Sequence, residues 1–284
     1  MILNYLKLTR LNQPTGIWLL FLPCLCGIFL VLKKLPELEI TETFRVIFLF
    51  FIGSIIMRSA GCIINDLLDV KFDGKVARTK IRPLAAKEIS KKSALIFLAI
   101  LLFFGLMILL KFNFKTILGG FFAMILVCTY PLMKRITYYP QIFLGLTFNF
   151  GVILSSLALQ NSITSDALIL YFSLVIWTLI YDTIYAFQDI EDDLRVGVKS
   201  SAIAFKKNPK KILNLLNLAM FFSLIFLGVN AKFNQVFFLI IFLSNSILSY
   251  KITKCDFKNS TNCLSIFKQN VAIGSLIALA IFSG

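Results

Sequence analysis

Nine apolar stretches, each about as long as a membrane span, dominate this sequence. A helix needs about 20 mainly apolar residues to cross a bilayer, and a helix satisfies its own backbone hydrogen bonds in lipid. The stretches cover approximately residues 15–32, 46–65, 92–110, 115–133, 141–160, 167–187, 211–230, 234–252 and 268–283. The sequence therefore predicts an all-α polytopic bundle of about nine transmembrane helices, in one domain over residues 1–284. The tightest connection is expected at 111–115.

The composition excludes several other classes of protein. Hydrophobic residues make up 58% of the chain and charged residues only 15%, far from the quarter that is usual in soluble domains. We therefore exclude a soluble globular enzyme, a disordered chain and a disulfide-rich secreted domain. The chain has no histidine, which excludes histidine-ligated metals and every mechanism with a histidine base. Its six cysteines form no C-x-x-C pair and are expected to behave as small apolar residues.

The net charge of +15 fits a membrane protein better than a nucleic-acid-binding protein, because Lys and Arg gather in cytoplasmic loops. With nine spans and the N-terminus inside, the inside segments hold 22 of the 29 Lys and Arg residues. The outside loops hold six, and Arg58 lies within a span. This asymmetry predicts a cytoplasmic N-terminus and a C-terminus on the opposite side.

Acidic residues are concentrated at the inside ends of two spans. The first window reads GCIINDLLDVKFDGKVARTKIRPL, residues 61–84. Asn65, Asp69 and Asp73 follow at intervals of four, and Asp66 lies close to the same helical face. Carboxylates so placed repel one another unless a cation lies between them, and carboxylates in an apolar span are usually functional. Mg²⁺ suits them, since it takes one or two carboxylates and bridges to phosphate oxygens.

The second window, YDTIYAFQDIEDDLRVGVKSSAIAF at residues 181–205, repeats this pattern. Asp182, Asp189 and Asp193 are expected on one face of a continuing helix, whereas Glu191 and Asp192 are expected to be solvated, with Arg195 or Lys199 as partners for their charge. Two acidic helix ends on one membrane side predict two facing carboxylate walls that hold Mg²⁺ around a diphosphate. The alternative for each window is a solvated helix end.

Basic residues follow both acidic windows and are candidates for binding a diphosphate. They are Arg78, Lys80, Arg82, Lys134, Arg135 and Lys199. Ordinary loop charge remains the alternative for each of them. Arg58 differs, because it lies about two helical turns deeper than Asn65. Its position calls for an anion: either a substrate carboxylate or a side chain such as Asp182.

These motifs resemble the UbiA family of intramembrane prenyltransferases, and within it the branch that prenylates 4-hydroxybenzoate in ubiquinone synthesis. The N-D-x-x-D-x-x-x-D pattern is present at 65–73 and the D-x-x-Y-A-x-x-D-x-x-x-D pattern at 182–193. R-T-K-x-R-P-L follows at 78–84, Y-P-x-x-K-R at 130–135, RLNQPTG at 10–16 and KSSAI at 199–203. The resemblance covers residues 8 to 206; no motif anchors the last third.

The resemblance implies a Mg²⁺-dependent transfer of a polyprenyl group from polyprenyl diphosphate to the carbon ortho to the hydroxyl of 4-hydroxybenzoate. It implies metal binding by Asp66, Asp69, Asp73, Asp189 and Asp193, with Asp69 and Asp189 essential for turnover and Asp182 the candidate base. Substrates would be bound by Arg58, Asn65, Arg78, Lys80, Arg82, Tyr130, Lys134, Arg135, Tyr185 and Lys199. The expected location is the inner membrane of a bacterium, with the active-site loops cytoplasmic; no nucleic acid or protein partner is expected.

Three alternatives remain open at this stage. A related prenyltransferase with another aromatic or lipid acceptor would carry the same acidic motifs. DGKVAR at 73–78 matches part of the motif of phosphatidyl-group transferases, but Asp69 has the wrong spacing. A secondary transporter would place its charges near the span centres, whereas these acids lie at the ends.

Overall fold

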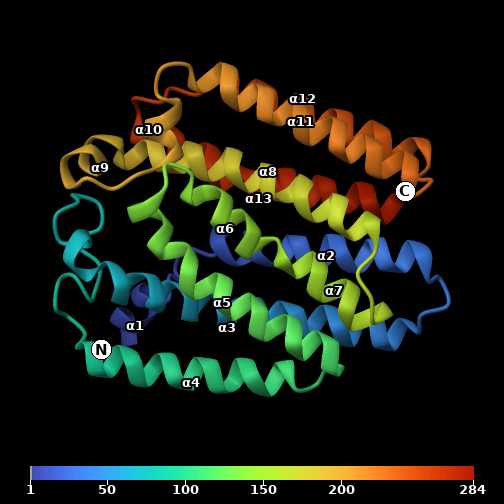
Figure 1. Cartoon of the computed structure of the whole chain (residues 1–284), viewed down its shortest axis with the longest axis horizontal. Helices are drawn as coiled ribbons and strands as arrows, with labels where there is room; N and C mark the ends of the chain where they lie inside the picture. Colours follow the sequence, from blue (N-terminus) through green and yellow to red (C-terminus); the bar gives the residue numbers. More distant parts are fainter. Residues whose placement is uncertain (1) are drawn as a thin grey trace.

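The computed structural model describes residues 2–284 and, among these, all side chains but those of Ile2 and Lys71. Every regular element in this range is a helix (Figure 1). The elements are α1 (Ile2–Leu8), α2 (Thr15–Lys34), α3 (Ile40–Asp73), α4 (Lys91–Leu109), α5 (Phe114–Ile136), α6 (Pro140–Phe148), α7 (Phe150–Gln160), α8 (Ser165–Ala186), the 3₁₀ turn η1 (Phe187–Asp189), α9 (Ile190–Val196), α10 (Ser201–Phe205), α11 (Pro209–Asn230), α12 (Gln235–Lys254) and α13 (Ser260–Ser283).

Nine helical stretches within residues 2–284 are long and apolar enough to cross a membrane, which confirms the predicted fold class. The division at 111–115 is confirmed too. The side chain of Asn113 caps α5 by accepting a hydrogen bond from the backbone N–H of Thr116 (3.0 Å), and Nδ2 of Asn113 donates to the carbonyl of Leu157 (2.8 Å). This N-cap lets the chain reverse direction within four residues.

The predicted span at 141–160 is interrupted in the structure. Asn149 lies between α6 and α7 and is fully buried. Its Nδ2 donates to the carbonyl of Gly145 and to Oγ1 of Thr178, both at 2.8 Å. A side chain that bonds to the carbonyl four residues earlier competes with the helix ladder, so the span is made of two helices.

The second acidic window also departs from the prediction of one continuing helix. α8 ends at Ala186, the 3₁₀ turn follows, and α9 begins at Ile190. The tighter winding of a 3₁₀ turn changes the register of the side chains that follow it. The expectation of one continuing α-helix through this window was therefore wrong.

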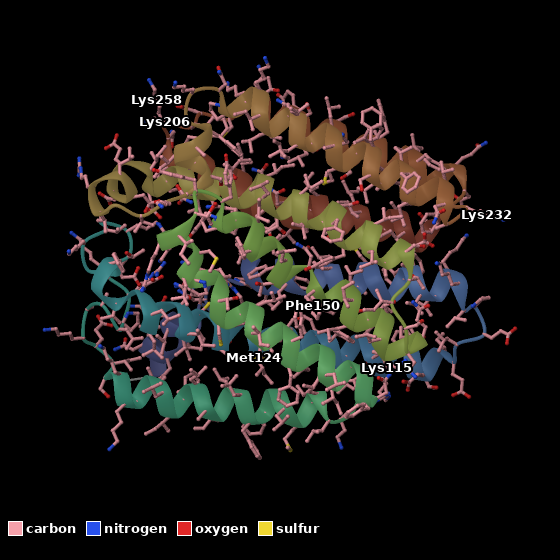
Figure 2. All side chains as sticks on the ribbon, viewed as in Figure 1. Lys115, Met124, Phe150, Lys206, Lys232 and Lys258 are labelled. Carbon is pink, nitrogen blue, oxygen red and sulfur yellow. The ribbon has the colours of Figure 1, made fainter. Side chains whose placement is uncertain are left out.

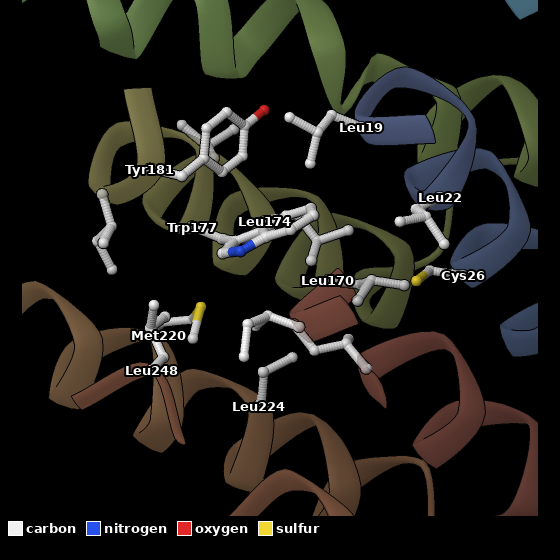
Figure 3. Packing of buried hydrophobic residues seen from close by; sticks show 14 of the residues in the cluster. Leu19, Leu22, Cys26, Leu170, Leu174, Trp177, Tyr181, Met220, Leu224 and Leu248 are labelled. Carbon is white, nitrogen blue, oxygen red and sulfur yellow. The ribbon is translucent and has the colours of Figure 1, made fainter. Parts of the chain in front are cut away.

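The main core lies where α2, α8 and α13 meet α11 and α12. Figure 3 shows Trp177 and Tyr181 of α8 among Leu22, Leu170 and other apolar side chains. Nε1 of Trp177 donates to Oδ1 of Asn270 at 3.0 Å, so the indole N–H is satisfied inside the bundle. By contrast, α4 lies at the edge (Figure 1) and more than half of Phe103 and of Phe104 is exposed, as expected of a helix facing lipid.

The two ends of the bundle differ. α1, α9, α10 and the connection 74–90 gather at the end that holds the N-terminus, and the C-terminus lies at the other end (Figure 1). Lysines lie at both ends, with Lys206 and Lys258 on one and Lys115 and Lys232 on the other, while Met124 and Phe150 occupy the middle (Figure 2). The predicted placement of the termini on opposite sides agrees with this arrangement.

Candidate active site

A polar cavity of about 280 Å³ lies at the end of the bundle where α3 and α8 finish. It is lined by the N-terminal segment, the connection 74–90 and the residues around η1, together with residues of α5, α6 and α13. Most of the site residues predicted from the sequence line it, from both acidic windows. They are Arg58, Asn65, Asp69, Asp73, Arg78, Arg82, Tyr130, Lys134, Asp182, Tyr185, Asp189, Asp193 and Lys199.

The first acidic wall is the last part of α3, which remains helical to Asp73 as predicted. Asp66, Asp69 and Asp73 are all buried, with exposed fractions of 2%, 0% and 6%. Oδ2 of Asp69 forms an ion pair with Lys134 of α5. Oδ1 of Asp69 is buried and receives no hydrogen bond from any described residue. Oδ1 of Asp69 lies 3.6 Å from Nη2 of Arg135, so basic side chains face both oxygens of this carboxylate.

Two arginines neutralise the other carboxylates of α3. Nη1 of Arg82 lies 2.9 Å from Asp73 and 3.1 Å from Asp66, and Nη2 of Arg10 lies 2.5 Å from Asp66. Burial raises the pKa of Asp73; the Arg82 guanidinium opposes this rise, whereas the charges of Asp66 and Asp69 add to it. The buried carboxylates of this wall therefore require positive charge close by, because they repel one another.

Asp189 is the centre of the second wall and is held by Arg78 from the connection 74–90. Nε of Arg78 lies 2.8 Å from Oδ1, and Nη2 lies 2.5 Å from Oδ2. Nη1 of the same guanidinium donates to the hydroxyl of Tyr185 at 2.9 Å. Burial acts to lower the pKa of Arg78, but the hydrogen bond with Asp189 and the charges of Tyr185 and Asp189 outweigh it and raise the pKa. Arg78 remains charged and bridges the two acidic segments.

The remaining acids of the second window behave differently from one another. Asp193 lines the cavity, whereas Oδ2 of Asp192 accepts a hydrogen bond from the backbone N–H of Ala77 at 2.9 Å. Asp192 also lies 3.6 Å from Arg195, one of its two expected partners. Because Asp192 fastens the connection 74–90 to α9, it is more than a solvated charge. Lys199 donates to the carbonyl of Ile136 at 3.0 Å beside the cavity.

Three predicted site residues do not line the cavity. Asp66 is buried beneath it, behind Arg10 and Arg82. Lys80 is exposed. Nη2 of Arg135 donates to the carbonyl of Leu68 at 2.9 Å, and the same atom lies 3.6 Å from Oδ1 of Asp69.

The cavity also contains residues that were not predicted as site residues, above all Arg10, Gln141 and Lys268. Arg10 follows α1 with a left-handed φ of 55°, a conformation that ends helices and here directs the guanidinium toward Asp66. Arg10 belongs to the RLNQPTG segment, and this motif was the feature of the sequence that could have indicated a role in the site. Oε1 of Gln141 accepts a hydrogen bond from the backbone N–H of Ser201 at 3.0 Å. Lys268 comes from α13, beyond the last recognised motif, and nothing in its local sequence indicates the cavity.

Arg58 lies inside α3, half-buried, at the inner end of this cavity. Its Cζ lies 5.3 Å from the centroid of the Phe148 ring. A Cβ on Gly16 would collide with the guanidinium, so glycine at this position makes room for Arg58. Within residues 2–284, Arg58 forms no ion pair and no side-chain hydrogen bond with Asp182 or any other group. The sequence left two alternatives for the anion near Arg58, a substrate carboxylate or Asp182, and the ion pair with Asp182 is not formed.

A second, apolar cavity of about 510 Å³ continues from this point toward the opposite end of the bundle. It is lined by α2, α3, α4, α5, α6 and α7 and the α4–α5 turn, with Phe50 and Phe112 near its far end. Arg58, Tyr130 and Phe148 line both cavities. The two therefore meet, and a molecule with a charged head and a long apolar tail can occupy both.

The donor atoms of the polar cavity fit Mg²⁺. Carboxylate oxygens are the ligands it prefers, and it keeps water and phosphate oxygens in the rest of its shell. Carboxylates from both walls line the cavity, namely Asp69, Asp73, Asp189 and Asp193. The described residues contain no group of three or more His, Cys, Asp or Glu side chains gathered as a complete metal site. The two walls therefore fit Mg²⁺ ions whose remaining ligands would come from a bound diphosphate.

Comparison with known proteins gives consistent results. A family model described as the UbiA prenyltransferase family matches residues 20–276. The chain is 42% identical over 283 residues to the mitochondrial 4-hydroxybenzoate polyprenyltransferase of Bos taurus, covering 99% of this chain and 75% of that one. It is 39% identical over 288 residues to the 4-hydroxybenzoate octaprenyltransferase of Blochmanniella pennsylvanica, covering 99% and 95%.

The fold also matches a solved structure. A UbiA homologue from Archaeoglobus fulgidus, bound to GPP and Mg²⁺, superposes with a TM-score of 0.70 over 99% of this chain and 100% of that one. The two sequences are 18% identical, so this likeness concerns the fold.

Proposed function

The chain belongs to the UbiA prenyltransferase family, and from this premise we propose that it is a 4-hydroxybenzoate polyprenyltransferase. It transfers the polyprenyl group of a polyprenyl diphosphate to the ring carbon ortho to the hydroxyl of 4-hydroxybenzoate, a reaction of ubiquinone synthesis. Two relatives that match 99% of this chain at about 40% identity are named 4-hydroxybenzoate polyprenyltransferase and 4-hydroxybenzoate octaprenyltransferase, which supports the resemblance predicted from the acidic motifs. The observation that carries the proposal is the junction of a carboxylate-lined cavity with an apolar one at Arg58.

The diphosphate is bound between the two acidic walls. Asp69 and Asp73 on one side, with Asp189 and Asp193 on the other, would hold Mg²⁺, which supplies positive charge to the leaving diphosphate. Asp66, expected from the sequence to bind metal, lies outside the cavity and pairs with Arg10 and Arg82. Arg78, Arg82 and Lys134 pair with these carboxylates in the structure. The same side chains lie within the cavity, where they donate hydrogen bonds to the diphosphate oxygens.

The acceptor is oriented by Arg58. Its planar guanidinium binds the acceptor carboxylate with two parallel hydrogen bonds, and Phe148 supports it from one side. Because the carboxylate is para to the hydroxyl, holding it fixes which ring carbon faces the allylic carbon. The absence of an ion-pair partner for Arg58 among the described side chains supports this role.

The remaining steps fall to groups that line the polar cavity. When the allylic C–O bond breaks, positive charge develops on the prenyl carbon, and the electron-rich faces of Tyr130 and Tyr185 stabilise it. The ring carbon then forms the new C–C bond. Asp182 lines the cavity and forms no ion pair in the described part of the chain, so its carboxylate accepts the ring proton.

The test is an acceptor screen with purified protein, octaprenyl diphosphate and Mg²⁺, in which prenylated product and free diphosphate are both measured. 4-Hydroxybenzoate is expected to react, and phenol, which lacks the carboxylate, to react poorly. If a different aromatic or lipid acceptor is preferred, the choice of acceptor is wrong and the family assignment stands. If chelation of Mg²⁺ leaves turnover unchanged, the metal assignment is wrong.

The protein is a multi-pass membrane protein by its nine apolar helices, counted over residues 2–284. We place it in the inner membrane of a bacterium, with the polar cavity facing the cytoplasm. The bias of Lys and Arg toward that side supports the orientation. Its named relatives include mitochondrial enzymes and a bacterial one. Fractionation of the source cells tests the location.

A further inference from the structure

Two glycines of α3, Gly53 and Gly61, line the apolar cavity without any packing need for glycine. A Cβ built on Gly53 would come within 4 Å of one described atom outside its own helix, Cγ2 of Ile108 at 3.9 Å. A Cβ on Gly61 would likewise meet only Cγ1 of Val127, at 3.9 Å, among the described atoms. Both are ordinary contact distances, so a larger residue would extend into the cavity.

Other glycines of the bundle differ from these two. A Cβ on Gly27 would lie 2.9 Å from the backbone of Val152, so α2 and α7 can approach closely only with glycine there. Glycine inside a helix is destabilising relative to alanine. At Gly53 and Gly61 neither close helix packing nor an unusual backbone conformation explains it. What these glycines provide is open space along one side of the cavity.

Gly53 and Gly61 lie at different depths in the apolar cavity, because they are separated along α3. The residues of α3 that line the cavity include Leu49, Phe50, Gly53, Ser54, Met57, Arg58 and Gly61, which form one face of the helix. Gly61 lies one turn from Arg58 on the side of the polar cavity, and Gly53 lies eight residues deeper. At a rise of 1.5 Å per residue, about 12 Å separates them. An extended isoprene unit advances roughly 5 Å, given carbon–carbon bonds of about 1.5 Å.

We propose that Gly53 and Gly61 determine which prenyl chain lengths the enzyme accepts, with Gly61 admitting the first units and Gly53 admitting the third and later ones. This inference rests on the proposed function, because the polar cavity must hold the diphosphate for the tail to start at Gly61. The occupant is the tail of the donor and not a separate lipid, since the two cavities meet at Arg58, Tyr130 and Phe148.

The experiment compares two donors, geranyl diphosphate with two isoprene units and octaprenyl diphosphate with eight. The measured quantity is the ratio of kcat/KM for the long donor to that for the short donor. In Gly53→Leu this ratio is expected to fall by roughly tenfold or more, because an overpacked cavity rejects the units that reach it. Gly53→Ala should change the ratio in the same direction by less. Gly61→Leu should impair both donors together.

The control variant is Phe48→Leu, on the same helix five residues from Gly53. Phe48 is 63% exposed and does not line the cavity, so its ratio should equal that of the wild type. Membrane abundance is measured for every variant. An unchanged ratio in intact Gly53→Leu, or an equal loss with both donors, would overturn the proposal. A wild-type protein that uses neither donor refutes the proposed function itself, before any variant is compared.

Discussion

Replacing Arg58 by alanine tests the acceptor site most directly. Arg58 contacts Phe148 and lies against Gly16 but forms no ion pair among the described residues. Its removal therefore breaks no internal ion pair, and the protein should insert at normal levels. The expected loss lies in binding of the acceptor carboxylate, because Arg58 is the one basic residue, among those described, that lines both cavities.

The size of this loss follows from the burial of Arg58. Truncating one partner of a buried, hydrogen-bonded charge pair costs about 2–5 kcal/mol. Because Arg58 is half-buried, we expect the lower part of that range, about 2–3 kcal/mol. At about 1.4 kcal/mol for each factor of ten, the KM for 4-hydroxybenzoate should rise roughly 30- to 150-fold. Arg58→Lys should recover part of the loss, since lysine lacks the planar fork.

The assay measures KM for both substrates and the amount of protein in the membrane. The matched control is Arg45→Ala: Arg45 lies on the same helix but at its other end, where it is exposed and pairs with Glu42. That variant should behave as the wild type. If Arg58→Ala leaves the KM for 4-hydroxybenzoate unchanged, Arg58 does not bind the acceptor. If both KM values rise together while protein is lost, its role is structural.

Three further predictions concern the acidic walls and the topology. Asp69→Ala and Asp189→Ala should each abolish turnover with the protein still in the membrane, because each removes a carboxylate from a different wall; near-normal activity of either variant in Mg²⁺ would contradict the two-wall arrangement. Asp193→Asn should lower activity more than Asp192→Asn, since Asp193 lines the cavity and an amide oxygen at 192 still accepts the Ala77 N–H; equal losses would show that this contact matters as much as the cavity. A reporter that is active only outside the cytoplasm, fused after Gly284, should be active, and an inactive fusion to intact protein would reverse the predicted orientation.

Most of the fold and the site could be predicted from the sequence because both depend on strong local patterns. Apolar stretches of span length specify helices, and Asn113 between two of them specifies a tight turn. The acidic residues in the two windows converge because both windows lie at the same membrane face. The break at Asn149 was not predicted, since it depends on a hydrogen bond to Thr178 from a distant helix.

The other features that could not be predicted from the sequence also depend on tertiary contacts. The 3₁₀ turn at Phe187–Asp189 changes the helical register, yet Asp182, Asp189 and Asp193 still line one cavity. Their convergence was predicted from one continuing α-helix, which the 3₁₀ turn interrupts. Lys268 reaches the cavity only because α13 packs beside α8 and η1, and no sequence motif encodes that packing.

The pairing of charges determines which variants can separate function from stability. Asp66, Asp69 and Asp189 are paired with Arg10, Lys134 and Arg78, each from a different segment, so these pairs also hold the segments together. Removing one partner leaves a buried charge without its counter-ion, which is destabilising as well as damaging to the site. Loss of activity in such a variant is therefore informative only beside its abundance in the membrane. Arg58 and Asp182 have no ion-pair partner within residues 2–284, and both line the polar cavity. A loss of activity at these two positions reports on the substrates, because no ion pair of the fold is lost with it.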